Sequence, residues 1–360
     1  MPKRRPEVFE GNRMAQSMVG LDISSRRLLA VEIDGVGGKR PTLVRAHQVE
    51  LAPTDARDSE VLDVPAVGDA LKRLWNEAGF KSKRAVLGVG NQRVLVREHT
   101  VPVLPLAQLR ASLPYQVADL LPVPVEETIL DFYPVEEVAG SEPPAMRGLL
   151  VAALTEAVET NVAALTAAKL GVAGVDLSAF AIVRALAPTG ELAGTHTIVA
   201  IGARTSHIIV VRDGVPRFVR IIPSGGESVT DAIEPQVTEG RAAAEAVKWR
   251  LGLDGVAHPQ YAALSRAMFD SLNGLINAVR STNSYYVSSD HGGTIDSIIL
   301  IGTEAQVPGL PRAIAENVGL AVRVGDPLTG IVLGRDLTPE SLAPLGPDLA
   351  VPIGLALGGE

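Results

Sequence analysis

The sequence of 360 residues contains no cysteine, which excludes disulfide bonds, thiolate metal sites and cysteine nucleophiles. Positive charge is in deficit, because 33 Lys and Arg stand against 41 Asp and Glu and the net charge is −8. Such a balance argues against general affinity for nucleic acid or for an anionic membrane surface. Long apolar runs are missing too: residues 349–359 are fewer than the roughly 18 that a membrane span needs, and they include Pro352. These absences predict a cytoplasmic protein that does not span a membrane.

Signatures of the common enzyme and targeting classes are also missing. No apolar segment follows the basic residues that begin at Lys3, so a secretory signal peptide is not expected. The six histidines show no spacing of three or four residues that would suit a metal site. Gly35-Val-Gly-Gly-Lys is better explained as a hairpin turn than as a phosphate-binding loop, and Gly88-Val-Gly lacks the third glycine of a dinucleotide-binding loop.

What the sequence does contain is a duplicated pattern. After a polar leader over residues 1–17, two apolar segments within residues 19–33 flank a short polar loop, which predicts a β-hairpin. A second strand–loop–strand begins at Thr197 and continues into a further strand over residues 217–222. The repeat, with 46% apolar and 21% charged residues overall, predicts two similar α/β lobes.

Residues 91–170 interrupt this symmetry. Apolar spacing predicts three strands there, over 94–100, 128–133 and 149–153, and two helices, over 106–121 and 157–170. We therefore expect an inserted α+β subdomain at 91–170. The first lobe then comprises residues 18–90 and 171–194, with 345–360 returning to it, and the second lobe comprises 195–344.

Several short stretches, in order and at consistent spacing, carry a family resemblance. They are Gly20-Leu-Asp-Ile-Ser-Ser, Ala30-Val-Glu-Ile, Leu120-Leu-Pro-Val-Pro-Val-Glu-Glu, Leu130-Asp-Phe, Ile201-Gly-Ala, Val211-Arg-Asp-Gly, Arg220-Ile-Ile-Pro-Ser-Gly-Gly-Glu, Ala244-Glu-Ala-Val-Lys, Arg280-Ser-Thr-Asn-Ser-Tyr-Tyr, Val307-Pro-Gly-Leu and Ile353-Gly-Leu-Ala-Leu. In these the chain resembles the type IV pilus assembly protein PilM family, relatives of the cell-division protein FtsA. The resemblance implies an actin-like ATPase (ribonuclease H-like) fold, in which residues 91–170 correspond to the FtsA-type 1C subdomain.

The resemblance also implies a nucleotide site between the lobes, and the chain departs from the family pattern at its phosphate end. Asp22 and Ser25 match the first phosphate loop, but Ser24 stands in place of a glycine and Leu29 in place of a lysine. Ala200 replaces the aspartate whose carboxylate would organise hydrated Mg²⁺. Asp22 and the two serines are equally consistent with backbone capping in a turn.

At the adenosine end the match is mixed. Gly202, Gly225 and Gly226 match family glycines, although a plain turn explains Gly225 and Gly226 equally well. Glu245 and Lys248 match a Glu-x-x-Lys that frames ribose and base, and their alternative is a solvated helical ion pair. Gly302 is followed by Thr303 and then a carboxylate where backbone should pass close to a nucleotide. ATP and Mg²⁺ are thus the implied cofactors, and we expect weak binding at best and no meaningful hydrolysis.

The family also implies a partner, the N-terminal cytoplasmic tail of the inner-membrane protein PilN, bound between the first lobe and the insert. Arg97 on the expected strand 94–100 could anchor the tail, or form a surface ion pair. Leu120, Leu121 and Val123, around Pro122, could line the groove or form the core of the insert.

The sequence therefore predicts a cytoplasmic actin-like scaffold of the pilus machine, held at the inner membrane through its partners. The alternatives are an active Mg-ATPase or filament protein, a type II secretion relative, whose family continues into a membrane helix, and an FtsA-like membrane tether. A tether calls for a basic amphipathic C-terminal helix, and residues 349–360 have no basic face. The oligomeric state is left open.

Overall fold

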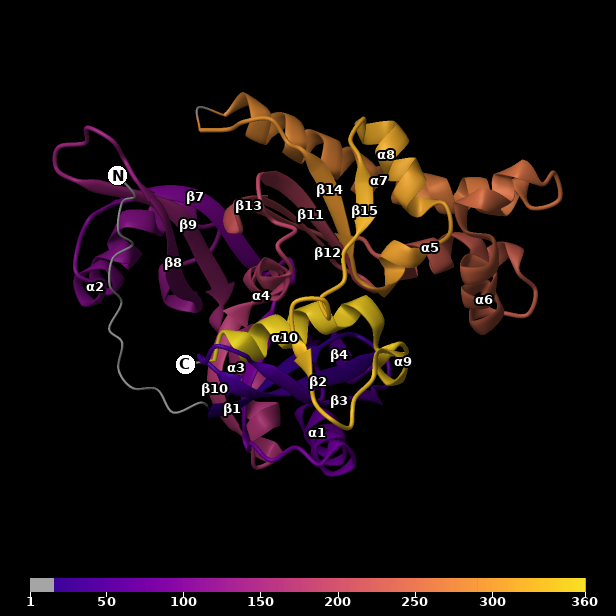
Figure 1. Ribbon diagram of the computed structural model, residues 1–360, viewed down its shortest axis with the longest axis horizontal. Coiled ribbons are helices and arrows are strands. Elements are labelled where there is room, and N and C mark those ends of the chain that lie inside the picture. Colours follow the sequence, from indigo (N-terminus) through magenta and orange to yellow (C-terminus); the bar gives the residue numbers. More distant parts are fainter. Residues whose placement is uncertain (1–15, 290, 360) are drawn as a thin grey trace.

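The computed structural model describes residues 16–289 and 291–359, which form two lobes and an insert (Figure 1). The expected leader, residues 1–17, lies outside the described residues except for Gln16 and Ser17, which begin the first strand. The first lobe has a six-stranded sheet in the order β10-β6-β1-β2-β3-β16. Its strands are β1 (Gln16–Ile23), β2 (Arg27–Val36), β3 (Thr42–Glu50), β6 (Arg84–Val89), β10 (Gly171–Leu177) and β16 (Val332–Leu333).

The β1–β2 hairpin is buried on both faces, which explains why its apolar residues run almost without interruption. On one face, Val19, Leu21 and Ile23 pack against α1 (Val64–Ala78) and α3 (Thr155–Ala167). On the other face, Met18 and Leu29 lie in a core that includes α4 (Ser178–Leu186) and α10 (Ala350–Leu357). Two-residue strands β4 (Ala56–Arg57) and β5 (Glu60–Val61) form a separate small hairpin.

The second lobe repeats this arrangement around a sheet in the order β13-β12-β11-β14-β15. Its strands are β11 (Thr195–Ile201), β12 (Ser206–Arg212), β13 (Val215–Ile222), β14 (Ser297–Ile301) and β15 (Val322–Val324). Its helices are α5 (Gly226–Ile233), α6 (Arg241–Leu251), α7 (Ala262–Ser288) and α8 (Leu310–Val318). Strand β11 is buried along its whole length, as the expected second hairpin requires, and β1 and β11 each pair antiparallel with the strand that follows.

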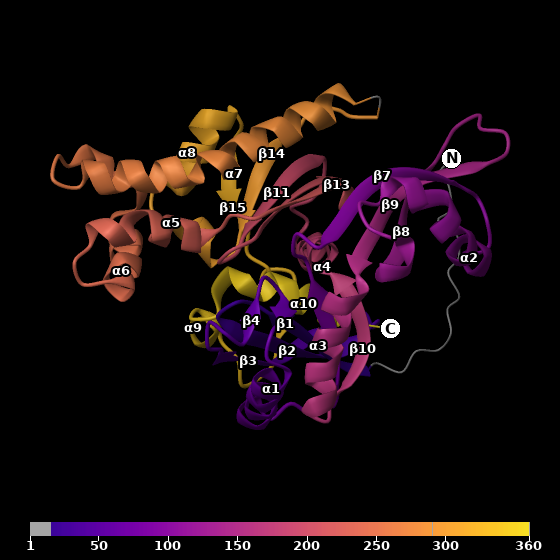
Figure 2. The ribbon, with the colours of Figure 1, turned by 180° about the vertical axis from the view of Figure 1, so that it is seen from behind.

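The insert is a three-stranded antiparallel sheet in the order β7-β9-β8, with one helix on one face (Figures 1 and 2). Its elements are β7 (Val94–Pro102), α2 (Leu106–Val117), β8 (Thr128–Glu137) and β9 (Ala145–Leu154). The expected helix over 106–121 ends at Val117 and is followed by a 3₁₀ turn, Ala118–Leu120. Helix α3, which we expected inside the insert, packs instead against α1, because Ala164 and Leu165 belong to the core of the first lobe.

Helices α4 and α10 lie between the two sheets and join the lobes, as both views show (Figures 1 and 2). They approach their neighbours closely through glycine. A Cβ on Gly354 of α10 would overlap the backbone of Ala181 in α4, and a Cβ on Gly20 of β1 would overlap the carbonyl of Pro352. The remaining helix is the short α9 (Pro339–Leu342). Among the residues the structure describes, no helix is both long and apolar enough to cross a bilayer.

Glu32 in β2 is a fully buried carboxylate that ties the first sheet to the loop after α1. Its oxygens accept hydrogen bonds from the backbone N–H of Lys81 at 3.0 Å and of Ser82 at 2.8 Å, and they pair with Arg45 at 2.7 Å. Removing it deprives two backbone donors and one guanidinium of their acceptor and leaves a cavity where the carboxylate was fully buried.

We therefore predict that Glu32→Ala lowers the free energy of unfolding by about 3 kcal/mol, measured by urea denaturation. The exposed Glu50 on neighbouring β3 is the matched control, and Glu50→Ala should stay within about 0.5 kcal/mol of wild type. Equal effects of the two substitutions would show that the buried carboxylate does not anchor the loop.

Candidate functional site

The loop of the first hairpin meets the second lobe at a boundary, called the cleft below, where charged residues of the two lobes pair. Arg26, between β1 and β2, pairs with Glu227 at the start of α5 at 2.6 Å. Glu227 also accepts from Arg204, in the loop of the second hairpin, at 3.0 Å. One carboxylate thus binds guanidinium groups from both hairpin loops, which brings the duplicated elements together as the sequence predicted.

Ser24 is committed to the turn of its own hairpin. Its N–H donates to the Arg27 carbonyl at 2.9 Å, and its hydroxyl both donates to that carbonyl at 3.0 Å and accepts from the Arg27 N–H at 3.1 Å. Ser25 beside it is buried. These contacts correspond to the turn interpretation of Ser24 and leave its hydroxyl no free donor.

Asp22 lies near the end of β1, opposite Leu29 on β2. Burial raises the pKa of its carboxyl to about 6, an effect that Arg27 opposes and nearby Asp348 reinforces. Leu29 is buried in the core between the lobes, and so is Ala200 of β11. In the described part of the chain, no three His, Asp or Glu side chains converge as a metal site would require.

A second link between the lobes runs through Asp348, in the 3₁₀ turn Gly346–Leu349 before α10. Its carboxylate pairs with Arg27 of the first hairpin. It also accepts from the N–H of Thr303 at 2.8 Å and from the Thr303 hydroxyl at 2.7 Å. Both hydrogen-bond donors of Thr303, which follows β14 and Gly302, are therefore engaged by protein.

The residues that we expected at an adenosine end form a buried cluster of charge. Lys248 of α6 is fully buried, which overturns the solvated-pair interpretation, although its pairing with Glu245 is present at 2.8 Å. Its ammonium also pairs with Glu304 at 2.9 Å and donates to the carbonyl of Gly226 at 3.3 Å. Glu245 accepts further from Thr230 at 2.6 Å. Burial raises the pKa of Glu304, and Lys248 opposes that rise.

The matched glycines hold two loops against each other. The N–H of Gly226 donates to the carbonyl of Gly202 at 3.0 Å, and a Cβ on Gly225 would overlap that same carbonyl. A Cβ on Gly226 would overlap the carboxylate of Glu304. Close approach of backbone is thus sufficient to require glycine at 225, whereas a side chain at 226 would displace the Glu304 carboxylate.

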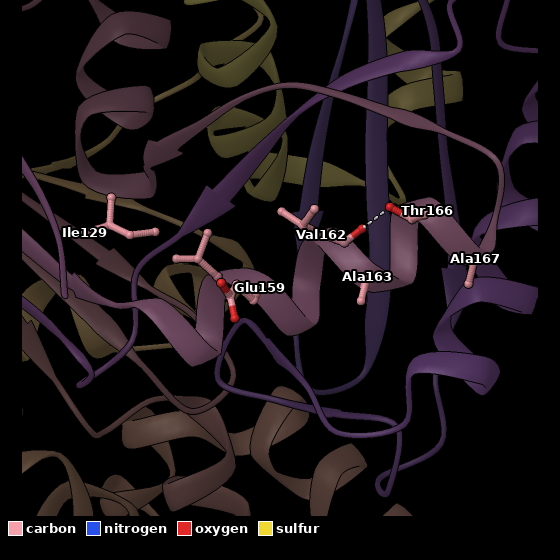
Figure 3. Close-up of a pocket in the computed structure, with 7 residues that line it drawn as sticks. Ile129, Glu159, Val162, Ala163, Thr166 and Ala167 are labelled. Carbon is pink, nitrogen blue, oxygen red and sulfur yellow. Dashed lines mark hydrogen bonds between the residues drawn. The ribbon is translucent and has the colours of Figure 1, made fainter. Parts of the chain in front are cut away.

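A different feature, an apolar groove of about 720 Å³, lies between the first lobe and the insert. Figure 3 shows Ile129 of β8 on one side and the exposed side of α3 on the other. Its lining residues are Ile129, Val158, Glu159, Val162, Ala163, Thr166 and Ala167. None of them was expected from the sequence as a groove residue, although Ala163, Thr166 and Ala167 follow a spacing of three and four that could have marked an exposed, small-residue face of α3.

The structure does not bring the predicted partner residues to this groove. Arg97 pairs across the sheet with Leu150, and Leu150 with Phe132, which faces α2 in the core of the insert. Ile129 lies three residues before Phe132 and therefore points to the opposite face. Arg97 donates to the carbonyl of Leu120 at 3.4 Å. Leu120 and Leu121 pack against the core of the insert, and Val123 is half-buried.

Comparison with known proteins agrees with this architecture. The family model described as type IV pilus assembly protein PilM matches residues 20–360. The chain belongs to the PilM family. A solved PilM–PilN type IV pilus biogenesis complex is similar at a TM-score of 0.84 and 24% identity, over 96% of this chain and 99% of that one.

More distant solved structures are similar to this chain in fold only. The ethanolamine utilization protein EutJ from Carboxydothermus hydrogenoformans matches at a TM-score of 0.57 and 15% identity, over 97% of this chain and 92% of that one. MreB5 of Spiroplasma citri, solved with ADP, matches at a TM-score of 0.51 and 13% identity, over 88% of this chain and 94% of that one. The expected α/β actin-like ATPase fold is thereby confirmed.

The raised pKa of Asp22 predicts how the stability of the native state depends on pH. Its folded pKa of about 6 exceeds the ordinary 3.8, so the native state holds the proton more tightly than the unfolded chain does. The stability that the protonated Asp22 carboxyl contributes to the native state is therefore fully present below about pH 4 and is lost as the pH rises through about 6.

Asp22→Asn removes the charge and nearly preserves the shape. We expect it to raise the free energy of unfolding by about 1–3 kcal/mol near pH 8 and to change it little near pH 4, by urea denaturation at both pH values. If Asp22→Asn is less stable than wild type near pH 8 but equally stable near pH 4, the attraction between ionised Asp22 and Arg27 outweighs the cost of burying the charge.

Proposed function

We propose that this PilM-family chain is a scaffold of type IV pilus assembly, which holds the extended cytoplasmic tail of a PilN-like membrane protein in the groove between α3 and β8. The observation that carries the proposal is the groove itself, which is open, apolar and wide enough for a segment of chain. Through that tail the scaffold would sit at the inner face of the membrane. We propose that the insert is the counterpart of the FtsA-type 1C subdomain.

The two walls of the groove suit an extended peptide in different ways. Ile129 is 45% exposed, an unusual state for a large apolar side chain on a strand with one free edge. Strand β8 pairs only with β9 among the described strands, so its outer backbone groups are available for strand addition. On the α3 side, Ala163 and Ala167 are small and exposed, which leaves room for apolar side chains of the tail.

A second candidate function is an active ATPase, favoured by the similarity to MreB5, which was solved with ADP. The phosphate end of the cleft supports the scaffold instead. Ala200 and Leu29 offer neither a carboxylate for Mg²⁺ nor a cation for phosphate, and the hydroxyl of Ser24 is committed to its own turn.

The groove is tested by titrating a fluorescent synthetic peptide, the cytoplasmic N-terminal tail of the PilN-like protein of the same organism, into wild type and variants. We expect Ala163→Asp to weaken binding at least about tenfold, because the tail would bury an unpaired carboxylate. Ile129→Ser should weaken it through lost apolar contact.

Ala111→Asp is the matched control, since Ala111 is an exposed alanine of α2 on the other face of the insert. It should bind like wild type, and so should Arg97→Ala. If Arg97→Ala abolishes binding while Ala163→Asp retains it, the tail binds the α2 side and the groove assignment is wrong.

A further inference from the structure

The interlobe cleft differs from a nucleotide site in one respect that the sequence did not reveal. Its buried cation, Lys248, is already bound by a carboxylate of the protein, that of Glu304. Lys248 is 0% exposed, and an ammonium removed from water is stable only when it is paired. Its partners come from two directions, Glu245 from its own helix and Glu304 from the 3₁₀ turn Thr303–Gln306 after β14.

The Glu304 side chain is packed as well as paired. Its carboxylate lies against Gly226, where even one added carbon would overlap it, and its side chain is 14% exposed. It thereby fills the space among the start of α5, the side of α6 and the end of β14. This is the space that the Glu-x-x-Lys and double-glycine resemblance assigned to ribose and base.

The charge count at this position is unfavourable to a further anion. Two carboxylates face one ammonium, and Asp348 lies near enough to raise the pKa of Glu304 further. An anion placed beside Lys248 would meet this local excess of negative charge in a largely buried site, where like charges repel strongly. Arg26 and Arg204, the cations of the two hairpin loops, are both already paired with Glu227.

Protein carboxylates also bridge the two lobes. Glu227 binds Arg26 of the first hairpin and Arg204 of the second, while Asp348 joins Arg27 to Thr303. The cleft is therefore closed by contacts that the chain supplies itself, and the residues present do not fit a Mg-nucleotide.

From these contacts we propose that Glu304 is the resident occupant of the position beside Lys248 and excludes adenine nucleotides from it, while Glu227 and Asp348 keep the lobes bridged without a ligand. The proposal concerns a different site from the partner groove and stands separately from it. Glu304 can be removed without leaving a buried charge unpaired, because Lys248 retains Glu245 at 2.8 Å and the Gly226 carbonyl.

The test is a calorimetric titration of ATP, with and without Mg²⁺, into wild type, Glu304→Ala, Glu304→Gln and the control Glu316→Ala, an exposed glutamate of α8. We expect wild type and Glu316→Ala to bind with a Kd above about 1 mM. Glu304→Ala should bind at least about tenfold more tightly than wild type, and Glu304→Gln, which loses the charge but retains the bulk, should gain clearly less than Glu304→Ala.

Micromolar binding of ATP by wild type overturns the proposal whether or not the variants fold. The proposal is also overturned if Glu304→Ala has a far-ultraviolet circular dichroism spectrum like that of wild type but gains no affinity for ATP. An equal gain in Glu304→Gln would overturn occupancy by the side chain and leave repulsion by its charge as the cause. The partner peptide should bind Glu304→Ala as it binds wild type, which separates this outcome from failure of the groove.

Discussion

The arrangement of this molecule depends on one apolar core that passes from the first sheet to the second around α4 and α10. Helix α10 packs on β1 through Gly20 and on α4 through Gly354, at distances that admit no side chain. Ile198 and Ile209 of the second sheet belong to the same core as Val31 of the first. Because this core is continuous, packing fixes how the lobes face each other, and the loops above it meet at fixed positions.

Charged side chains then complete the contact where the core ends. Apolar packing positions the loops, but the cleft lies beyond it, and there the chain uses guanidinium–carboxylate pairs centred on Glu227 and Asp348. Such pairs contribute little when they are fully solvated and more when they are partly buried and shared. Lys248 is the extreme case, since its burial is tolerable only while carboxylates remain beside it.

Much of the fold was predictable because both hairpins and the parallel strands β6 and β14 beside them are buried on both faces and read as apolar runs. Strand β3 was missed because Thr42–Glu50 has mostly half-buried residues that mix polar and apolar types. The cleft was only partly predictable: the sequence indicated a carboxylate after Thr303, but not that it reaches Lys248, 56 residues away. The groove was missed because β8 and α3 create it jointly, and neither has a distinctive sequence.

The position of α3 explains why the groove can be firm although it lies at a subdomain boundary. The helix follows β9 without a loop, so the insert leads directly into it. Its buried Asn161 accepts from the N–H of Val61 at 2.9 Å and donates to the carbonyl of Ser59 at 2.8 Å, which fastens it to the first lobe. One wall of the groove thus belongs to the helix fastened to the first lobe and the other to the insert sheet. A bound segment would contact both, so its affinity depends on the boundary that this asparagine holds in place.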